Sequence, residues 1–126
     1  MARILAVDDQ PHLTFIIHSL LTKHGHDVTR ACDGVAALER LMAEKFDVLV
    51  TDVDMPRMDG LTLLSHREAV DGLCGIIVLT SRDDFRELGL SHCRDRVEFL
   101  PKPFSPIKLA ELVDRFVLRQ PAPSAS

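Results

Sequence analysis

Hydrophobic residues occur along this chain in two alternating patterns: short unbroken runs, and longer stretches in which apolar residues recur at helical spacing. The short runs are rich in β-branched residues, which is typical of strands buried on both faces. The segment DVTRA at 27–31 is the weakest of these runs. Together the runs predict five strands, over residues 3–7, 27–31, 47–51, 75–80 and 97–100.

Apolar residues three and four positions apart predict helices after the strands. Pro11 suits the first turn of the first helix, where its missing N–H costs nothing, and Gly25 suits the position just past the end of that helix. Gly89 weakens the prediction of a helix over 82–90. Four more helices, the first of them the one that begins near Pro11, are defined by four groups of apolar positions in chain order. These are Leu13, Ile16, Ile17, Leu20 and Leu21; Leu38, Leu41 and Met42; Leu61 and Leu64; and Leu109, Leu112, Val113, Phe116 and Val117.

The order of these segments, a strand followed by a helix five times over, predicts the fold class. Strands without polar alternation need cover on both faces, so they are expected to form a parallel five-stranded sheet with helices on each side. Right-handed crossovers then give a doubly wound (βα)5 three-layer sandwich of the α/β class. In such folds ligands bind outside the carboxyl ends of the strands.

Length and composition fit one globular domain. The 126 residues are 46% hydrophobic, which is enough for a core, and 27% charged. No apolar run approaches the roughly 20 residues of a membrane span, and the N-terminus lacks the pattern of a signal peptide. A net charge of -4 argues against direct nucleic-acid binding as the main function. We therefore expect a cytoplasmic protein that binds neither membrane nor nucleic acid.

The cysteines and two neighbouring histidines have a structural interpretation. Cys32, Cys74 and Cys93 are widely spaced and odd in number, which predicts free thiols in a reducing compartment that pack as small buried hydrophobes. The spacing of His24 and His26 matches no metal site, and both side chains are expected to be solvated.

Polar residues follow most of the predicted strands directly. Because the carboxyl ends of parallel strands share one edge of a sheet, these side chains are expected to meet. Each also has a structural interpretation: Asp8 and Asp9 could cap the following helix, and Asp52 could open a turn before Pro56 and Gly60. The residues concerned are Asp8, Asp9, Asp52, Thr80, Ser81 and Lys102.

This set of side chains has the chemistry of a magnesium-dependent phosphoryl site. Carboxylates held at short range repel one another, and a divalent cation removes that penalty. A small number of oxygen ligands suits Mg²⁺, which retains several waters. Lys102 adds a positive charge and Thr80 a hydrogen-bond donor, as the oxygens of a phosphoryl group require. A carboxylate held there could attack phosphorus and become an aspartyl phosphate.

Four segments together resemble a response-regulator receiver domain of the CheY-like type. They are ILAVDD (4–9), VLVTDVDMPRMDG (48–60), IIVLTS (76–81) and FLPKPF (99–104). The resemblance covers residues 3–118, nearly the whole chain. It implies the flavodoxin-like strand order 2-1-3-4-5 and a receiver domain over residues 1–119. The Pro- and Ser-rich residues 120–126 predict a disordered tail.

The resemblance implies a role for each acid in the first two segments. Asp52 is expected to be the phosphoacceptor and, with Asp9, a direct ligand of Mg²⁺. Asp8 is expected to hold the ion largely through water, and Asp54 through its backbone carbonyl. Asp59 is expected to shape the turn before the next helix.

The other two segments supply the expected phosphate-binding and switch residues. Thr80, with Ser81 beside it, matches the switch hydroxyl that moves toward the phosphoryl group. Phe99 matches the aromatic residue that rotates inward with that hydroxyl. Lys102 matches the phosphate-binding lysine, and the Lys102–Pro103 bond resembles the cis peptide of the family.

Two positions near the expected site depart from the usual pattern. Asp54 lies two residues after the acceptor, and Arg82 lies two residues after Thr80. In this family these positions flank the path of water and tune dephosphorylation. We hypothesise that Asp54 and Arg82 form an ion pair across the mouth of the site, worth about 0–1 kcal/mol if exposed.

The region before the last strand departs as well. Receivers often carry Gly-Ala there, whereas this chain has Asp95-Arg96, and Gly89 precedes them. The fourth helix and the partner surface at 89–96 are therefore expected to be unusual. A basic strip for a partner or an anionic ligand is an alternative to a solvated face for Arg82, Arg86, Arg94 and Arg96.

The resemblance implies a signalling switch of a two-component phosphorelay, not an enzyme that turns over substrate. The donor would be a phosphohistidine on a sensor histidine kinase or a histidine phosphotransfer protein, and the phosphate would be lost slowly by self-hydrolysis. Only seven residues follow Arg119, so output is expected by contact with a downstream protein through the fourth helix, fifth strand and fifth helix. A receiver excised from a longer regulator is the alternative.

Two other functions remain open at this point. VLVTDVDM also resembles the Asp-x-Asp motif of haloacid-dehalogenase-type phosphatases, with Asp52 as nucleophile and Asp54 as general acid. Met55 replaces the usual Thr or Val of that motif, and the chain is short for a cap domain. Steady turnover of a phosphate monoester would distinguish that family.

A receiver-like binding module that works without phosphate has the unusual 89–96 region as its only support.

Overall fold

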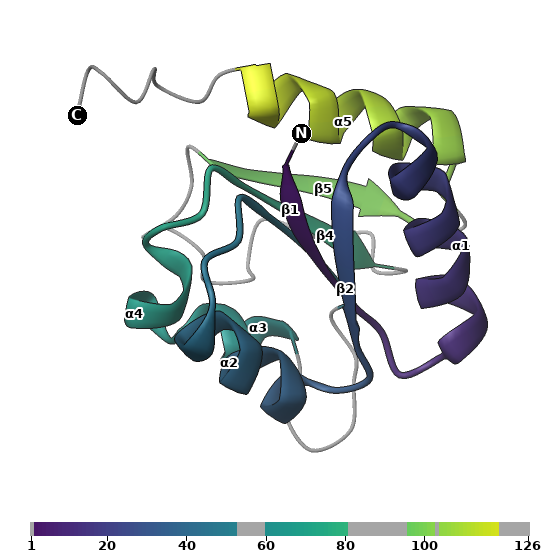
Figure 1. Cartoon of the computed structure of the whole chain (residues 1–126). Helices are drawn as coiled ribbons and strands as arrows, with labels where there is room; N and C mark the ends of the chain where they lie inside the picture. The colour runs from purple at the N-terminus through teal and green to yellow at the C-terminus, as the bar shows by residue number, and fades with distance from the viewer. Residues whose placement is uncertain (1, 53–59, 81–95, 103, 119–126) are drawn as a thin grey trace.

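Strands and helices alternate along residues 3–80 as the hydrophobic pattern predicts. A computed structural model of the protein describes residues 2–52, 60–80, 96–102 and 104–118 (Figure 1). Its elements are β1 (Arg3–Val7), α1 (Pro11–Lys23), β2 (Asp27–Ala31), α2 (Gly34–Ala43), β3 (Val48–Asp52), α3 (Gly60–Leu64), α4 (Arg67–Val70), β4 (Gly75–Thr80), β5 (Val97–Pro101) and α5 (Pro106–Leu118).

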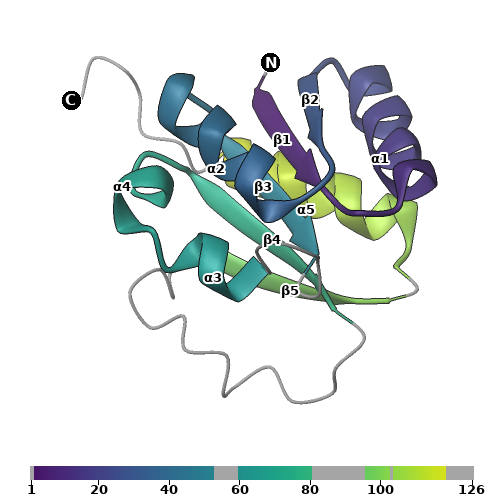
Figure 2. The ribbon, with the colours of Figure 1, turned by 90° about the horizontal axis from the view of Figure 1, so that it is seen from below.

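The strands form one parallel sheet in the order β2-β1-β3-β4-β5, which confirms the predicted fold class. Figures 1 and 2 show α1 and α5 on one face of this sheet and α2, α3 and α4 on the other. The chain leaves β1 toward one edge of the sheet and leaves β3 toward the other edge. The carboxyl ends of β1 and β3 therefore form the switch point at which ligands bind in doubly wound folds.

A hydrophobic layer lies on each face of the sheet, because each strand is apolar on both sides. One layer joins α1 and α5 to the sheet and contains the ring of Phe116. Gly75 at the start of β4 provides the space for that ring, since an added Cβ would collide with it. The other layer lies under α2, α3 and α4 and includes Leu49 and Ile76.

Most element boundaries agree with the sequence pattern, and three elements differ. β5 ends at Pro101, one residue later than predicted. β3 spans Val48–Asp52, one residue later than predicted, because the Asp47 carboxylate accepts a hydrogen bond from the backbone N–H of Arg3 and Asp52 pairs with Leu79 in the ladder. The helix α4 was not predicted, since its few residues show no helical period. The expected helix at 82–90 and the tail at 120–126 lie outside the described residues.

Some apolar and thiol side chains are more exposed than the sequence predicts. Ile16 and Met42, assigned to buried helix faces, have 43% and 57% of their surface exposed. Cys32 is exposed and Cys74 is half-buried, so the prediction that they pack as buried hydrophobes was wrong for Cys32. Both of these thiols are free, as expected, and Cys93 lies outside the described residues.

His26 is buried, so the prediction that it is solvated was wrong. The backbone N–H of Ala2 donates to its Nδ1 at 3.2 Å, and its Nε2 lies 3.3 Å from a carboxylate oxygen of Asp114 on α5. A ring nitrogen that accepts a hydrogen bond carries no proton, so Nε2 carries it and donates to Asp114. The ring thus joins the N-terminus, the start of β2 and α5.

Arg96 has a structural role that the sequence interpretation missed. One nitrogen of its guanidinium, Nη1, donates to the backbone carbonyls of Val70 and Leu73 at 2.9 and 2.7 Å. These carbonyls end α4 and the loop that leads to β4. Arg96 therefore holds this loop against the beginning of β5 and is not part of a fully solvated face. Its companions at 82, 86 and 94 lie outside the described residues.

None of the helices that the structure describes combines the length and the apolar character that a membrane crossing requires.

Candidate functional site

The strand register brings the sequence-predicted residues to one edge of the sheet. Val7 pairs with Thr51, so the next residues, Asp8 and Asp52, emerge side by side from β1 and β3. On the other side of β3, Asp52 pairs with Leu79, and Thr80 is the last residue of β4. Thr80 pairs in turn with Pro101, which places Lys102 immediately beyond β5. The carboxyl edge thus carries an acid at the end of each of the neighbouring strands β1 and β3.

Three carboxylates converge at this edge. One ligand oxygen from each of Asp8, Asp9 and Asp52 lies within 4.8 Å of the other two. Asp8 and Asp52 are buried, with 1% and 7% of their surface exposed, whereas Asp9 faces solvent. The three acids therefore form a cluster whose inner members are buried at the end of the sheet and whose outer member, Asp9, is exposed.

Lys102 joins two of the three acids. Its Nζ lies 2.9 Å from an oxygen of Asp52 and 3.4 Å from an oxygen of Asp8. Its backbone N–H donates to the carbonyl of Thr80 at 2.8 Å, which holds the lysine against the end of β4. The ammonium is thus held beside Asp52, the carboxylate that the sequence resemblance predicts to be the phosphoacceptor.

The neighbouring charges shift the pKa values of Asp8 and Lys102. Burial raises the pKa of Asp8, and the nearby Asp52 carboxylate adds to the increase, while the N–H of Gln10 and Lys102 act against it. Burial lowers the pKa of Lys102, but its hydrogen bond to Asp52 and the charge of Asp8 outweigh burial and raise it above the usual value. Lys102 therefore stays protonated, and a nearby cation would offset the cost of ionising the buried Asp8.

The donor set fits a divalent cation. Three carboxylates against one ammonium leave a formal charge of -2 among Asp8, Asp9, Asp52 and Lys102, which a divalent ion neutralises. All three ligand groups offer oxygen, the donor that Mg²⁺ prefers, and Asp9 is exposed to the solvent from which the ion retains its waters.

The helix-capping alternative for the first two acids does not fit the geometry. Gln10 is the N-cap of α1, and no side chain makes a capping hydrogen bond there. The Asp8 carboxylate instead accepts the backbone N–H of Gln10 at 2.9 Å, which orients the acid at the end of β1. Asp33, by contrast, does cap α2 by accepting from Ala36.

The remaining expected residues are placed only in part. Thr80 is buried at the end of β4, and Phe99 on β5 is partly buried against the hydrophobic layer under α2, α3 and α4. Four other residues with expected roles lie outside the described residues: Asp54, Ser81, Arg82 and Pro103. The structure therefore does not test the expected ion pair between Asp54 and Arg82. The structure thus brings together the three acids and Lys102 but leaves the mouth of the site undescribed.

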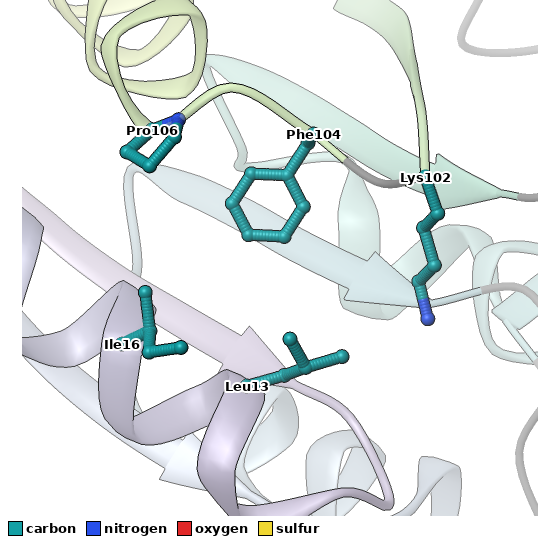
Figure 3. A pocket seen from close by; sticks show the side chains of 5 residues that line it. All are labelled: Leu13, Ile16, Lys102, Phe104 and Pro106. Atoms are coloured by element: carbon teal, nitrogen blue, oxygen red, sulfur yellow. The ribbon is translucent and has the colours of Figure 1, made fainter.

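The structure adds an apolar pocket that sequence reasoning missed. It has a volume of about 400 Å³ and begins at Lys102 (Figure 3). Leu13 and Ile16 on α1 had been assigned only to the helix core face, and the one sequence signal was the aromatic residue two positions after Lys102. The lining residues are Leu13, Ile16, Lys102, Phe104 and Pro106.

Comparison with known proteins identifies a family for nearly the whole chain. The model of the response regulator receiver domain matches residues 4–114. This match assigns the chain to receivers and not to the haloacid-dehalogenase-type phosphatases.

Curated relatives are longer than this chain. The response regulator MprA of Mycobacterium leprae is 40% identical over 125 residues, which cover 96% of this chain and 53% of the relative. The MprA protein of Mycobacterium ulcerans is 40% identical over 115 residues, covering 90% of this chain and 47% of the relative. The chain therefore spans about half the length of these response regulators.

Solved structures share the fold along almost their full length. The receiver domain of the Francisella response regulator 1452 superposes with a TM-score of 0.82 at 28% identity, covering 94% of this chain and 98% of that one. The response regulator TrrA of Thermotoga maritima, whose structure is a complex with Mg²⁺ and BeF, gives 0.79 at 29% identity, covering 92% and 99%. This chain therefore shares the fold of both structures.

Proposed function

This chain belongs to the response regulator receiver domain family, and we propose that it is a phosphorylation-activated switch in which Asp52 accepts a phosphoryl group. The observation that carries this proposal is the position of the Lys102 ammonium, 2.9 Å from Asp52 and within the same cluster as Asp8. An ammonium at this place can bind an oxygen of a phosphoryl group as it is transferred to Asp52.

The reaction is a displacement at phosphorus. An oxygen of the Asp52 carboxylate forms a bond to the phosphorus atom, and the bond from phosphorus to the donor breaks. For a phosphohistidine donor the departing group is the imidazole, which keeps the electron pair of the broken P–N bond and takes a proton. Mg²⁺ held by Asp8, Asp9 and Asp52 would neutralise charge on the phosphoryl oxygens. The backbone carbonyl of Asp54 is the further proposed ligand.

The proposed response to phosphorylation involves the neighbouring strands. The added negative charge at Asp52 favours an arrangement in which Thr80, with Ser81, donates toward the phosphoryl group and Phe99 turns inward with it. Support comes from the location of Thr80 at the end of the strand next to β3. Phe99 on β5 is partly buried and packs against the hydrophobic layer under α2, α3 and α4.

Partners and organisation follow from membership of a two-component system. We propose that the phosphoryl donor is a sensor histidine kinase or a histidine phosphotransfer protein in the cytoplasm. Residues 1–119 would be the receiver, with 120–126 as a tail. Output would pass to a protein target through the face that contains β5, α5 and the helix expected at 82–90. Asp54 and Arg82 would set the rate of hydrolysis.

The test is the intact mass of the protein after incubation with acetyl phosphate and Mg²⁺. We expect one added phosphoryl group, about 80 Da, which disappears when EDTA removes the metal and is absent in Asp52→Asn. The matched control is Asp71→Asn, an exposed acid between α4 and β4 that should be phosphorylated like the original chain. An adduct that persists in Asp52→Asn, or that forms equally with EDTA present, would contradict the proposal.

A further inference from the structure

Arg30, near the end of β2, connects that strand to the beginning of α1. Figures 1 and 2 show α1 lying beside β2. The Nε of Arg30 donates to the hydroxyl of Thr14 at 3.2 Å, and its Nη2 donates to the backbone carbonyl of Pro11 at 3.1 Å. Its guanidinium also lies 5.9 Å from the centre of the Phe15 ring. One side chain of β2 therefore contacts three residues in the first turns of the helix.

The first turn of α1 has no capping side chain of its own. Gln10, the N-cap, makes no side-chain hydrogen bond there, and the first turn contains no acidic residue. A positive charge is unfavourable near the N-terminus of a helix, so directed contacts account for the position of Arg30. One of these contacts is to Thr14, which has only 3% of its surface exposed. Arg30 thus supplies from β2 a constraint that the helix lacks locally.

The segment between β1 and α1 is held at both ends by the end of β2. The backbone N–H of Asp8 donates to the carbonyl of Ala31 at 3.2 Å. Three residues further along, the carbonyl of Pro11 accepts from Arg30. Asp9 lies between these two anchors and is the exposed member of the acidic cluster. The position of its carboxylate relative to the two buried acids therefore depends on how the first turn of α1 is held.

We propose that Arg30 is a positioning residue for Mg²⁺, which fixes the first turn of α1 so that Asp9 reaches the ion together with Asp8 and Asp52. This inference rests on the proposed function, because it assumes that these three acids hold Mg²⁺. It adds a residue that acts through the backbone it holds and not by contact with the ion. Replacing residues that orient metal ligands in this indirect way typically costs about 10- to 100-fold in metal affinity.

Charge and geometry predict opposite effects of removing this arginine. Arg30 is itself a cation, so the loss of its charge alone would strengthen the binding of Mg²⁺. The loss of its hydrogen bonds releases the first turn of α1, and Asp9 with it, which would weaken binding. Arg30→Ala should raise the Kd of Mg²⁺ about tenfold, the lower end of the range, because Arg30 acts through the backbone.

The measurement is a titration of the isotope-labelled full chain with MgCl₂ and no phosphodonor, followed through amide chemical shifts in NMR spectra. The matched control is Arg3→Ala at the amino edge of the sheet. The guanidinium of Arg3 likewise lies over an aromatic ring, 5.0 Å from the centre of Phe46, and donates to a backbone carbonyl, that of Lys45, at 2.9 Å. This control loses the same charge and similar contacts but should keep the Kd of the original chain. The spectra also establish that each variant is folded.

Thr14→Val tests the same connection from the helix and carries the test if Arg30→Ala does not fold. Valine keeps the size of threonine but removes the hydroxyl that accepts from Arg30. The Kd should rise about two- to fivefold, as expected for the loss of one hydrogen bond. The effect is smaller than in Arg30→Ala because the bond from Arg30 to Pro11 remains. The double variant should bind Mg²⁺ more tightly than the product of the two single effects predicts.

The outcomes separate this inference from the function on which it rests. An unchanged or lowered Kd in folded Arg30→Ala, or an unchanged Kd in Thr14→Val, would overturn the role of Arg30 while leaving the metal site intact. Equal increases in Arg30→Ala and Arg3→Ala would overturn it as well, since they would reflect a general loss of stability. No binding of Mg²⁺ by the original chain would contradict the proposed metal site and this inference together.

Discussion

Two carboxyl groups at opposite edges of the sheet respond to their surroundings in opposite directions. Burial raises the pKa of Asp8 at the carboxyl edge, so the native state holds that proton more tightly than the unfolded chain does. Hydrogen bonds from Arg3 and Arg40 lower the pKa of Glu44 at the amino edge. Ionised Asp8 therefore costs stability and ionised Glu44 adds to it. The acid that destabilises the metal-free fold is the one in the proposed site.

This difference predicts opposite effects of two conservative substitutions. The free energy of unfolding contributed at Asp8 falls as pH rises from its usual pKa through the raised one, so Asp8→Asn should stabilise the metal-free protein at neutral pH. The gain should be about 0.5–2 kcal/mol, since the asparagine keeps an oxygen for the N–H of Gln10. Urea denaturation in EDTA, repeated from acid to neutral pH, measures it.

Glu44→Gln is the control of opposite sign in that experiment. The stability that Glu44 contributes is present above its usual pKa and lost as pH falls through the lowered one. Its variant should therefore be less stable than the original chain at neutral pH and should converge with it in acid. A loss of stability in Asp8→Asn at neutral pH would show that the buried acid is not under electrostatic strain.

At the scale of elements, the sequence predicts what periodicity governs and misses what depends on long-range contacts. The apolar patterns of the five strands and of α1, α2, α3 and α5 reflect the face that each element buries. The structure places these elements within a residue or two of the predicted positions. α4 has too few residues to show a period. His26 was assigned to solvent because nothing near it in sequence reveals Asp114, 88 positions away.

Arg96 gives an element-level prediction because its guanidinium holds the loop between α4 and β4. Replacing it with alanine removes a charged donor from the carbonyls of Val70 and Leu73. Arg96→Ala should lower the free energy of unfolding by about 1.5–3 kcal/mol, the range for hydrogen bonds to charged groups. Urea denaturation measures the change.

A surface arginine provides the comparison for that variant. Arg40→Ala removes an exposed ion pair with Glu44, four residues later in the chain. Such i,i+4 pairs contribute about 0.3–0.5 kcal/mol to the free energy of unfolding. Equal losses in the Arg96 and Arg40 variants would mean that the carbonyls near α4 are satisfied by water and that Arg96 is not a structural anchor.

At the scale of the whole molecule, the topology explains why separate short motifs become one site. The order β2-β1-β3-β4-β5 places the ends of β1 and β3 next to each other at the switch point, and β4 and β5 follow in sequence on one side. Asp8, Asp52 and Lys102 are up to 94 positions apart in the chain, yet the register brings them within ion-pair distance.

The candidate site was predictable from sequence for the same reason. Once the strands are placed, a parallel sheet leaves little freedom in where the residue after each strand lies. The pocket beside Lys102 was not predictable in this way, because it depends on how α1 packs against the segment before α5. Sequence periodicity reports which face of α1 is apolar but not where that face is left uncovered.

The central claim is that Asp52, and no other acid of the cluster, accepts the phosphoryl group. The most direct measurement is reductive trapping: borohydride converts an aspartyl phosphate to homoserine, and sequencing of peptides by mass spectrometry locates the converted residue. After incubation with acetyl phosphate and Mg²⁺, the account predicts homoserine at position 52 alone. Homoserine at position 8, 9 or 54 with an unmodified Asp52 would contradict it.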